Sequence, residues 1–412
     1  MVVGGGAIGL SCARSLARSG HDVTVVERGR VGQGCSYANC GLIVPGHSMP
    51  VPGPGVIREG LGYLARRNSP FAIRPSLKLA PWLVSFWRAC NADAYRRASE
   101  RLVALSRASL ELFDELARQH TFGFRRDRLI HAYLSEEGVA QISVELEELD
   151  SLGISAQRLS RDELLGIEPA LSPSVLGGVL IEDQGWADPY AFTQALADDL
   201  RRTGRILEGT SVRRITTRNG RSTGVMSAEG PIDADLVVLT AGAWTPSLTE
   251  PLGLRMPIQP AAGYSSTIAS PSNGPKLPVV LPERRVVLTP LGDRLRFGGT
   301  LELSGFRTSI DRARYRAVIQ AGLDALSASV PRTAEEPWFG LRPLTSDGLP
   351  VIGWAPGVEG LLIAAGHGML GFTQAPITGQ LVADLATGRP PSLSVDPFRP
   401  DRFTRNLDNQ PA

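Results

Sequence analysis

Residues 1–29 read MVVGGGAIGLSCARSLARSGHDVTVVERG, and this stretch decides the fold. It begins with the end of an apolar strand and continues into the turn sequence G-x-G-x-x-G. An amphipathic pattern over residues 8–18 predicts a helix, and residues 22–27 predict a second strand that ends in Glu27. A strand, a glycine turn, a helix and a second strand in this order predict a dinucleotide-binding unit.

Each residue type in this unit has a physical reason. Gly4 permits the tight turn, Gly6 lets the backbone approach a pyrophosphate, and Gly9 lets the helix and strand pack closely. The N-terminus of the helix faces the phosphates. Glu27 is placed to accept hydrogen bonds from ribose hydroxyls, and its charge disfavours a 2′-phosphate. The motif by itself does not distinguish NAD from FAD. The expected contacts at this end also include Ala7, Ile8 and Arg28.

The bulk composition excludes several classes of protein. The chain has 412 residues, which suggests about two to three domains. Its net charge of +2 gives no electrostatic case for a nucleic-acid partner. The four cysteines form no Cys-x-x-Cys pair, so neither a disulfide scaffold nor a metal site is expected. No apolar run reaches the roughly 18 residues that span a bilayer. We therefore expect a soluble, cytoplasmic protein, with peripheral contact to the inner membrane left open.

The rest of the chain predicts a second, antiparallel part. Residues 234–244, ADLVVLTAGAW, predict a further parallel strand of the nucleotide domain that runs into a glycine turn. Residues 255–305 alternate apolar and polar residues between glycine and proline breaks, which is typical of an antiparallel sheet. Helices are predicted over residues 99–119, 136–152 and 311–329, and from Asp188 onward.

Residues 34–41, GCSYANCG, carry two cysteines with four residues between them. A pair at this place is compatible with a redox-active dithiol beside a flavin. It is equally compatible with a loop in which two small residues lie near the cofactor. The local sequence leaves both interpretations open.

Three stretches together resemble one family. Residues 35–55 (CSYANCGLIVPGHSMPVPGPG), 340–353 (GLRPLTSDGLPVIG) and 364–385 (AAGHGMLGFTQAPITGQLVADL) follow the N-terminal glycine motif in the expected order. With that motif, the chain resembles the D-amino acid oxidase-like family of FAD-dependent oxidoreductases, and within it the bacterial D-amino acid dehydrogenase small-subunit group. The resemblance covers nearly the whole chain.

The resemblance implies an α/β fold with a discontinuous Rossmann-like FAD-binding domain and an inserted α+β substrate domain built on an antiparallel sheet. The FAD-binding domain is expected at residues 1–50, 150–250 and 335–400. The substrate domain is expected at 51–149 and 251–334, and a tail at 401–412.

The resemblance also implies non-covalent FAD, because relatives with covalent flavin use a cysteine near the C-terminal signature and this chain has none there. In the group, position 40 is usually alanine, so the loop interpretation of Cys35 and Cys40 is favoured over a dithiol. The further residues expected at FAD are Ser36, Ala38, Asn39, Cys40, Gly41, Leu42, Val212, Ala241, Gly242, Trp244, Gly340, Arg342, Gly366, His367, Gly368, Met369, Leu370, Gly371 and Thr373.

The activity implied is oxidation of the amine of a D-amino acid to an imino acid, with hydride passing to flavin N5. Arg342 matches the arginine that binds the substrate carboxylate; the alternative is a structural ion pair, for example with Asp347. Tyr264 is expected either to donate to that carboxylate or to be a core tyrosine. His47 is expected to line the pocket. For His367, the backbone of the neighbouring glycines is expected to matter more than the ring.

Several alternatives stay open. The substrate is alternatively D-hydroxyproline or another cyclic or N-methyl amine, handled by a dehydrogenase or a sarcosine- or glycine-oxidase-like enzyme. A flavin disulfide reductase using Cys35 and Cys40 and a partner-dependent subunit are further classes. Sarcosine-type oxidases place a lysine where this chain has Arg296, which favours a dehydrogenase that passes electrons to a quinone or a protein. Residues 80–90, APWLVSFWRAC, are read either as a membrane-facing segment or as a buried helix.

Overall fold

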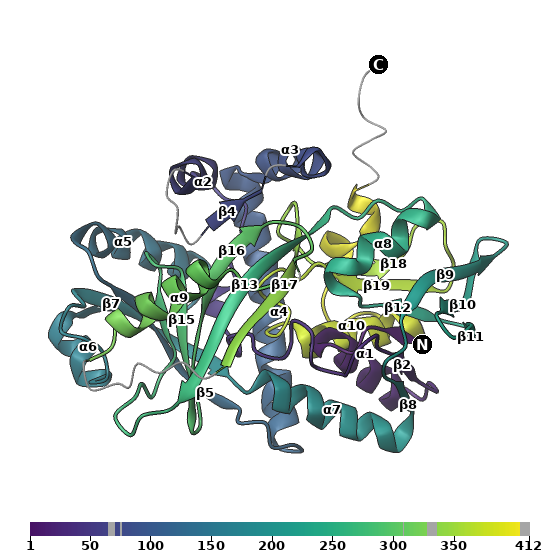
Figure 1. The fold of residues 1–412 in the computed structure, drawn as a ribbon, viewed down its shortest axis with the longest axis horizontal. Coiled ribbons are helices and arrows are strands. Elements are labelled where there is room, and N and C mark those ends of the chain that lie inside the picture. Colours follow the sequence, from purple (N-terminus) through teal and green to yellow (C-terminus); the bar gives the residue numbers. More distant parts are fainter. Residues whose placement is uncertain (65–70, 75, 308, 328–335, 404–412) are drawn as a thin grey trace.

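Two large sheets, side by side, organise the protein (Figure 1). The fold is described by a computed structural model for residues 1–64, 71–74, 76–307, 309–327 and 336–403. The smaller of the two sheets is built around the N-terminal strand. The larger sheet is mostly antiparallel and carries its own helices.

The N-terminal strand lies inside a six-stranded sheet. Its order is β18 (Val351–Trp354), β19 (Leu361–Ala365), β12 (Val237–Leu239), β1 (Val2–Val3), β2 (Thr24–Val26) and β8 (Arg205–Leu207). β1 pairs in parallel with both β2 and β12, and only β18 is antiparallel to its neighbour. The predicted strand, turn, helix and strand of residues 1–29, and the parallel strand within 234–244, are therefore confirmed.

The six-stranded sheet is covered on both faces. Helices α1 (Ala7–Arg18) and α10 (Ala375–Thr387) pack on one face, together with part of α4 (Ala92–Ala117). A three-stranded sheet of β11 (Pro231–Asp233), β10 (Arg221–Ser227) and β9 (Val212–Arg218) packs on the other. Because both faces are covered, the central strands β1, β12 and β19 are apolar and buried throughout, as is typical of parallel strands.

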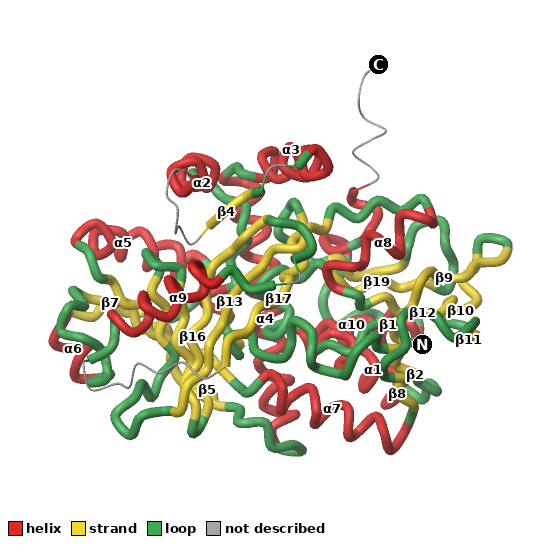
Figure 2. The backbone as a smooth tube through the Cα atoms, in the orientation of Figure 1, coloured by secondary structure: helices red, strands yellow, loops and turns green. Residues whose placement is uncertain are grey.

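The larger sheet has ten strands. Its main order is β17 (Glu336–Thr345), β13 (Ile258–Ala269), β16 (Arg294–Leu303), β15 (Val286–Leu291), β14 (Val279–Leu281), β5 (Arg125–Tyr133), β7 (Gly177–Trp186) and β3 (Leu42–Ile43). β4 (Phe71–Ile73) joins β16, and β6 (Ala156–Ser160) joins β7. Figure 2 shows this sheet as the dense block of strands beside the smaller one. The antiparallel sheet expected within 255–305 is confirmed.

The strand pairing differs from the expected division of the chain. Residues 150–250 and 335–400 were assigned to the FAD-binding part, but β6, β7 and β17 hydrogen-bond within the large sheet. β3, within residues 1–50, also pairs with β7. The domain boundaries therefore stay a prediction.

The remaining helices lie partly around the large sheet and partly beside the smaller one (Figure 1). They are α2 (Val56–Leu64), α3 (Ala80–Ala89), α5 (Glu136–Ser151), α6 (Arg161–Ile167), α7 (Pro189–Thr203), α8 (Thr245–Thr249) and α9 (Arg312–Asp324). α4 begins before the expected Ser99, because Asn91 caps it by accepting from Ala94 N at 2.9 Å. In the expected tail, residues 400–403 form a short 3₁₀ helix and 404–412 lie outside the described residues.

Across the described residues, every helix is too short or too polar to span a bilayer.

Candidate active site

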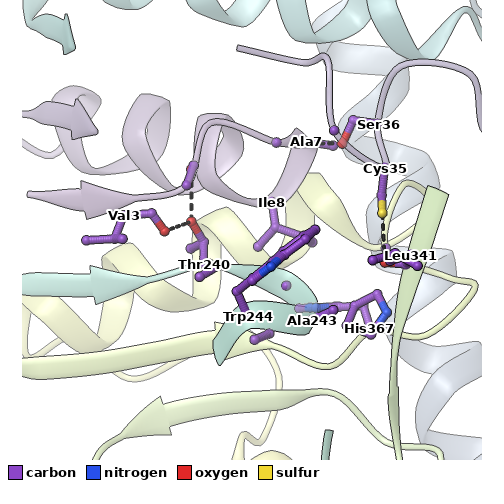
Figure 3. A pocket seen from close by; sticks show the side chains of 18 of the residues that line it. Val3, Ala7, Ile8, Cys35, Ser36, Thr240, Ala243, Trp244, Leu341 and His367 are labelled. Atoms are coloured by element: carbon purple, nitrogen blue, oxygen red, sulfur yellow. Dashed lines mark hydrogen bonds between the residues drawn. The ribbon is translucent and has the colours of Figure 1, made fainter. Parts of the chain in front are cut away.

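A cavity of about 320 Å³ opens beside β1, where the N-terminal turn meets β17 of the large sheet (Figure 3). Segments far apart in sequence line it. They are the glycine turn, the loop after Gly34, the end of β12, the turn after β19 and residues 341–343 of β17. It is therefore a site that only the assembled fold creates.

The cavity contains the N-terminus of α1. Gly6 precedes the helix and offers no side chain as a cap, so Ser36 supplies one: its Oγ accepts from Ala7 N at 2.9 Å. Thr240 Oγ1 donates to Val3 O at 2.8 Å and Gly4 O at 3.0 Å, which fixes the turn against β12. Ser36 and Thr240 thus fix the N-terminus of α1 in a position where it faces the cavity.

Glu27 lies at the far end of the same cavity. Its Oε2 accepts from Gly5 N at 2.7 Å and its Oε1 accepts from Gly29 N at 2.9 Å. Each carboxylate oxygen retains further acceptor capacity, which is what binding a ribose requires. Nearby, the Arg28 guanidinium lies 3.6 Å from the centre of the Trp244 ring, which also lines the cavity.

The two cysteines of the loop are separate thiols. Cys35 Sγ donates to Leu341 O at 2.7 Å and lines the cavity, as Figure 3 shows. Cys40 instead packs against Gly298 of β16. Burial raises the pKa of Cys35 to about 11 and raises the pKa of Cys40 as well. A thiol held protonated is a poor nucleophile, so the loop interpretation is favoured over a redox dithiol.

Arg342 points its guanidinium at the cavity from β17. Its Nη1 donates to Thr300 O, and within the described residues no carboxylate pairs with it. Asp347, the alternative partner, is bound by Arg402 with Nε–Oδ2 at 2.8 Å. Burial lowers the pKa of Arg342, as expected for a cation without a counter-ion. The site therefore holds an uncompensated positive charge.

His367 lines the cavity beside β17, where it forms an isolated bridge with Leu344, and its ring is neutral. Burial lowers its pKa to about 3. Thr378 Oγ1 donates its only proton to Gln374 O at 2.8 Å, so at 3.0 Å it accepts from His367 Nε2. The ring is therefore the Nε2–H tautomer, and its Nδ1 is an acceptor.

Comparison with known proteins shows the family to which a chain with this cavity belongs. The family model described as FAD dependent oxidoreductase matches residues 1–385. A D-amino acid dehydrogenase of Xanthobacter autotrophicus is 34% identical over 407 residues, covering 96% of each chain. One from Methylobacterium nodulans is 34% identical over 98% of this chain and 99% of its own.

The chain belongs to the FAD dependent oxidoreductase family.

Solved structures agree with this fold. A glycine oxidase from Geobacillus kaustophilus superposes with a TM-score of 0.79 at 24% identity, covering 97% of this chain and 96% of its own. An L-proline dehydrogenase from P. horikoshii gives 0.72 at 22% identity, covering 98% and 97%. The α/β class, with an FAD-binding Rossmann-like part and a substrate part, is confirmed.

The described residues fit FAD, the cofactor of this family. Gly9 lies so close to the Gly4 carbonyl that a Cβ would overlap it, and a Cβ on Gly4 would lie 2.6 Å from Thr240 O. These glycines form a cradle that only bare backbone can make. Ser36, Glu27 and Arg342 all line the same cavity as this cradle.

Most of the residues expected at FAD line this cavity. They are Gly4, Gly6, Ala7, Ile8, Glu27, Arg28, Ser36, Asn39, Val212, Ala241, Gly242, Trp244, Arg342, Gly366, His367, Gly368, Met369 and Gly371. Their contacts with FAD remain predictions.

Ten expected residues lie outside the cavity lining: Gly9, Ala38, Cys40, Gly41, Leu42, Gly340, Leu370, Thr373, Tyr264 and His47. Several have structural tasks instead. Thr373 Oγ1 donates to Leu42 O at 2.9 Å, Ala38 O accepts from Ser265 Oγ at 2.6 Å, and Gly340 leaves room for the Trp338 ring. These residues hydrogen-bond to or pack against the segments that line the cavity, without lining it themselves.

Tyr264 and His47 are the two expected catalytic residues that the structure places elsewhere. Tyr264 is 1% exposed, and its hydroxyl donates to Glu302 Oε2 at 2.8 Å. His47 stacks edge-on against His131 with ring centres 5.1 Å apart, and burial lowers its pKa to about 3. Strand pairing places Tyr264 on the opposite face of β13 from Ala261 and Gly263, which lie beside Arg342.

Sequence reasoning missed several cavity residues. They include Thr210, Ser211, Thr240, Ala243, Leu341, Pro343 and Phe372. Thr240 ends a predicted parallel strand, and carboxyl ends of such strands are where ligands bind, so this position carried a usable signal. Residues 210 and 211 lie between β8 and β9, where the sequence shows no comparable signal for a ligand site.

Proposed function

We propose that this FAD-dependent enzyme oxidises the amine of a D-amino acid to an imino acid and passes the electrons to a quinone or another acceptor. The observation that carries the proposal is the guanidinium of Arg342, which lines the cavity without a carboxylate partner among the described residues. The relatives that are 34% identical and named D-amino acid dehydrogenases support the substrate class.

A free carboxylate suits this cation. A guanidinium presents parallel N–H donors that match two carboxylate oxygens, and such charge-assisted pairs are among the stronger hydrogen bonds in proteins. Thr300 O occupies Nη1 of Arg342, which leaves the other donors for a ligand. Binding the α-carboxylate here fixes the orientation of the adjacent α-carbon.

The chain supplies position and charge rather than a strong base. When bound, FAD supplies the redox chemistry, since it accepts hydride from the α-carbon. Arg342 orients the substrate, and the neutral ring of His367 lines the same cavity without adding a second charge. The amine must be uncharged for hydride to leave, and the imino acid formed is then hydrolysed by water.

Two observations bear on the alternatives. The raised pKa values of Cys35 and Cys40, both caused mainly by burial, speak against a disulfide reductase. The similarity in fold to a glycine oxidase and an L-proline dehydrogenase keeps a cyclic or N-methyl amino acid as the second candidate substrate. Arg296 donates to Asn39 O at 2.9 Å and lies outside the cavity lining, so no lysine-like cation faces the cavity from that position.

Peripheral membrane contact belongs to the same proposal. Helix α3 buries Trp82 and Phe86 but leaves Trp87 64% exposed, and nearby Leu77 is 95% exposed. Both residues lie on the projecting part of the molecule formed by α2 and α3 (Figure 1). Exposed Arg88 adjoins Trp87, a combination that suits an anionic lipid surface and a quinone dissolved in it.

Anaerobic reduction of the flavin tests the proposal. D-proline, D-hydroxyproline, D-alanine, sarcosine, L-proline and NADPH are added separately, and bleaching of the flavin absorbance is followed. We expect a D-amino acid to bleach it fastest. Bleaching by NADPH alone would contradict the proposal and return the thiols to consideration. Co-sedimentation with anionic vesicles, compared between the unmodified protein and Trp87→Ser, tests the membrane contact.

A further inference from the structure

Gly263 of β13 lies directly beneath the guanidinium of Arg342. β13 and β17 pair Gly263 with Gly340 and Ala261 with Arg342, so residues 261, 263 and 342 share one face of the sheet. A methyl group on residue 263 would lie 2.5 Å from Nη2 and 2.6 Å from Nη1 of Arg342. The guanidinium therefore occupies the space that any other residue at 263 would fill.

The backbone of Gly263 itself does not require glycine. Its φ angle is not in the positive range that favours glycine. The atoms nearest to the position of a Cβ belong to the flexible end of the Arg342 side chain. An alanine would therefore displace Arg342 rather than strain the strand. The need for glycine at 263 comes from the position of the guanidinium.

A β-bulge holds the same guanidinium from the next strand. Along β13, residues 262 and 264 pair with Glu302 and Gly299 of β16, so β16 carries one extra residue there. Thr300, inside the bulge, has φ +67°, which a β-branched residue rarely adopts. Its carbonyl accepts from Arg342 Nη1. Backbone strain of this kind persists where the surroundings enforce it and is common beside functional groups.

We propose that Gly263 and the bulge at Thr300 are positioning elements, which hold the guanidinium of Arg342 in one place for the substrate carboxylate. This inference rests on the proposed function, in which Arg342 binds that carboxylate. A long flexible side chain loses conformational freedom when it binds a ligand, and holding it beforehand removes that cost. The space left by Gly263 and the carbonyl of Thr300 both act on Arg342, and neither acts on the substrate.

The test measures binding of benzoate, a simple carboxylate, to the FAD-loaded protein from the change in the flavin spectrum. We expect Arg342→Met to raise Kd about 100-fold and Gly263→Ala about 10-fold. Thr300→Gly should keep the unmodified Kd, because the carbonyl stays and glycine suits a positive φ. Gly166→Ala is the matched control, since nothing lies within 4 Å of its Cβ position.

The double variant Gly263→Ala/Arg342→Met separates positioning from direct contact. We expect it to bind benzoate no more weakly than Arg342→Met alone. In turnover with the substrate, Gly263→Ala should raise KM more than it lowers kcat.

The failures can be told apart. An unchanged Kd for Gly263→Ala, with a large loss for Arg342→Met, would overturn the positioning role and leave the proposed function standing. A further loss in the double variant, or a Gly263→Ala protein that does not fold or retain FAD, would also overturn it. An Arg342→Met protein with the unmodified Kd, or no benzoate effect on the unmodified protein, would contradict the proposed function itself.

Discussion

The turn after β1 and the strand pair β13–β17 both depend on glycine, but in different ways. At the turn, Gly4 and Gly9 lie five residues apart and shape a cradle within one βαβ unit. In the strand pair, Gly263 makes room for Arg342, which comes from a strand nearly eighty residues later. The glycine turn is local, so the sequence predicts it. The space that Gly263 leaves for Arg342 exists only after β13 and β17 have paired.

The largest expected effect lies on the strand pair. Arg342→Met should lower kcat/KM about 100- to 1000-fold, because a cation that pairs with a buried carboxylate is worth roughly 2–5 kcal/mol. The FAD content should stay unchanged, since the loss concerns the substrate end of the cavity. Steady-state kinetics with the best D-amino acid checks it. Arg342→Lys is the matched variant and should recover only part of the loss, because a lysine lacks the planar pair of donors.

The next effect lies on the turn. Gly9→Ala would force a methyl group into the Gly4 carbonyl, and overpacking of this kind typically costs about 1–3 kcal/mol. We expect FAD to bind about 10- to 100-fold more weakly. Fluorescence titration of the apoprotein with FAD measures this, with Gly166→Ala as the control. Normal FAD affinity in the Gly9 variant would mean that the turn is less tightly built than the structure indicates.

A smaller effect concerns pH. The pKa of His367 is lowered by burial from 6.5 to about 3, so between these values the unfolded chain binds the extra proton. Stability should therefore fall as pH drops below 6.5, by up to about 1.4 kcal/mol per pH unit for this group. Melting temperatures between pH 7.5 and 5, compared with those of His367→Gln, check the slope. An identical slope in both proteins would assign the effect to other groups, among them His47, whose pKa burial also lowers to about 3.

The tautomer of His367 has its own measurement. In ¹⁵N-labelled protein, the ring should give one pyrrole-like nitrogen, at Nε2, and one pyridine-like nitrogen, at Nδ1, without titration between pH 5 and 9. Thr378→Val removes the hydroxyl that accepts from Nε2 and should shift that signal. A doubly protonated ring in this range would contradict both the burial and the assignment.

The smallest effect is expected at Cys40, in the loop whose two cysteines would be essential in a flavin disulfide reductase but not in an amino acid dehydrogenase. Cys40→Ala should leave activity within about twofold, because Cys40 fills space against Gly298 and a small residue is tolerated there. Activity measured with the D-amino acid and with a disulfide substrate decides between the classes. Loss of activity in Cys40→Ala, but not in Cys12→Ala, would restore the dithiol hypothesis.

These regions also show how far sequence reasoning reached. The expected helix start near Asp188 is confirmed, since its side chain caps the helix locally. The N-terminus of α4 was placed too late, because its periodic pattern is weak before Ser99. At the cavity, the glycine turns and Arg342 were found from motifs. His47 was expected to line the cavity and lies elsewhere, and of the two roles open for Tyr264 the structure shows the core tyrosine, since single aromatic residues carry no signal of which face they occupy.

The sequence by itself determined the βαβ unit and the antiparallel sheet, because both are encoded by hydrophobic periodicity and turn residues close along the chain, and it determined the family through a set of short motifs in a fixed order. Only the tertiary structure decided that β7 joins the large sheet, that the two thiols lie apart, and that Arg342 has no carboxylate partner among the described residues. Those facts depend on strand register and on side-chain burial between distant segments. Moving a strand by one residue would reverse which side chains face the cavity, and no local pattern fixes that choice.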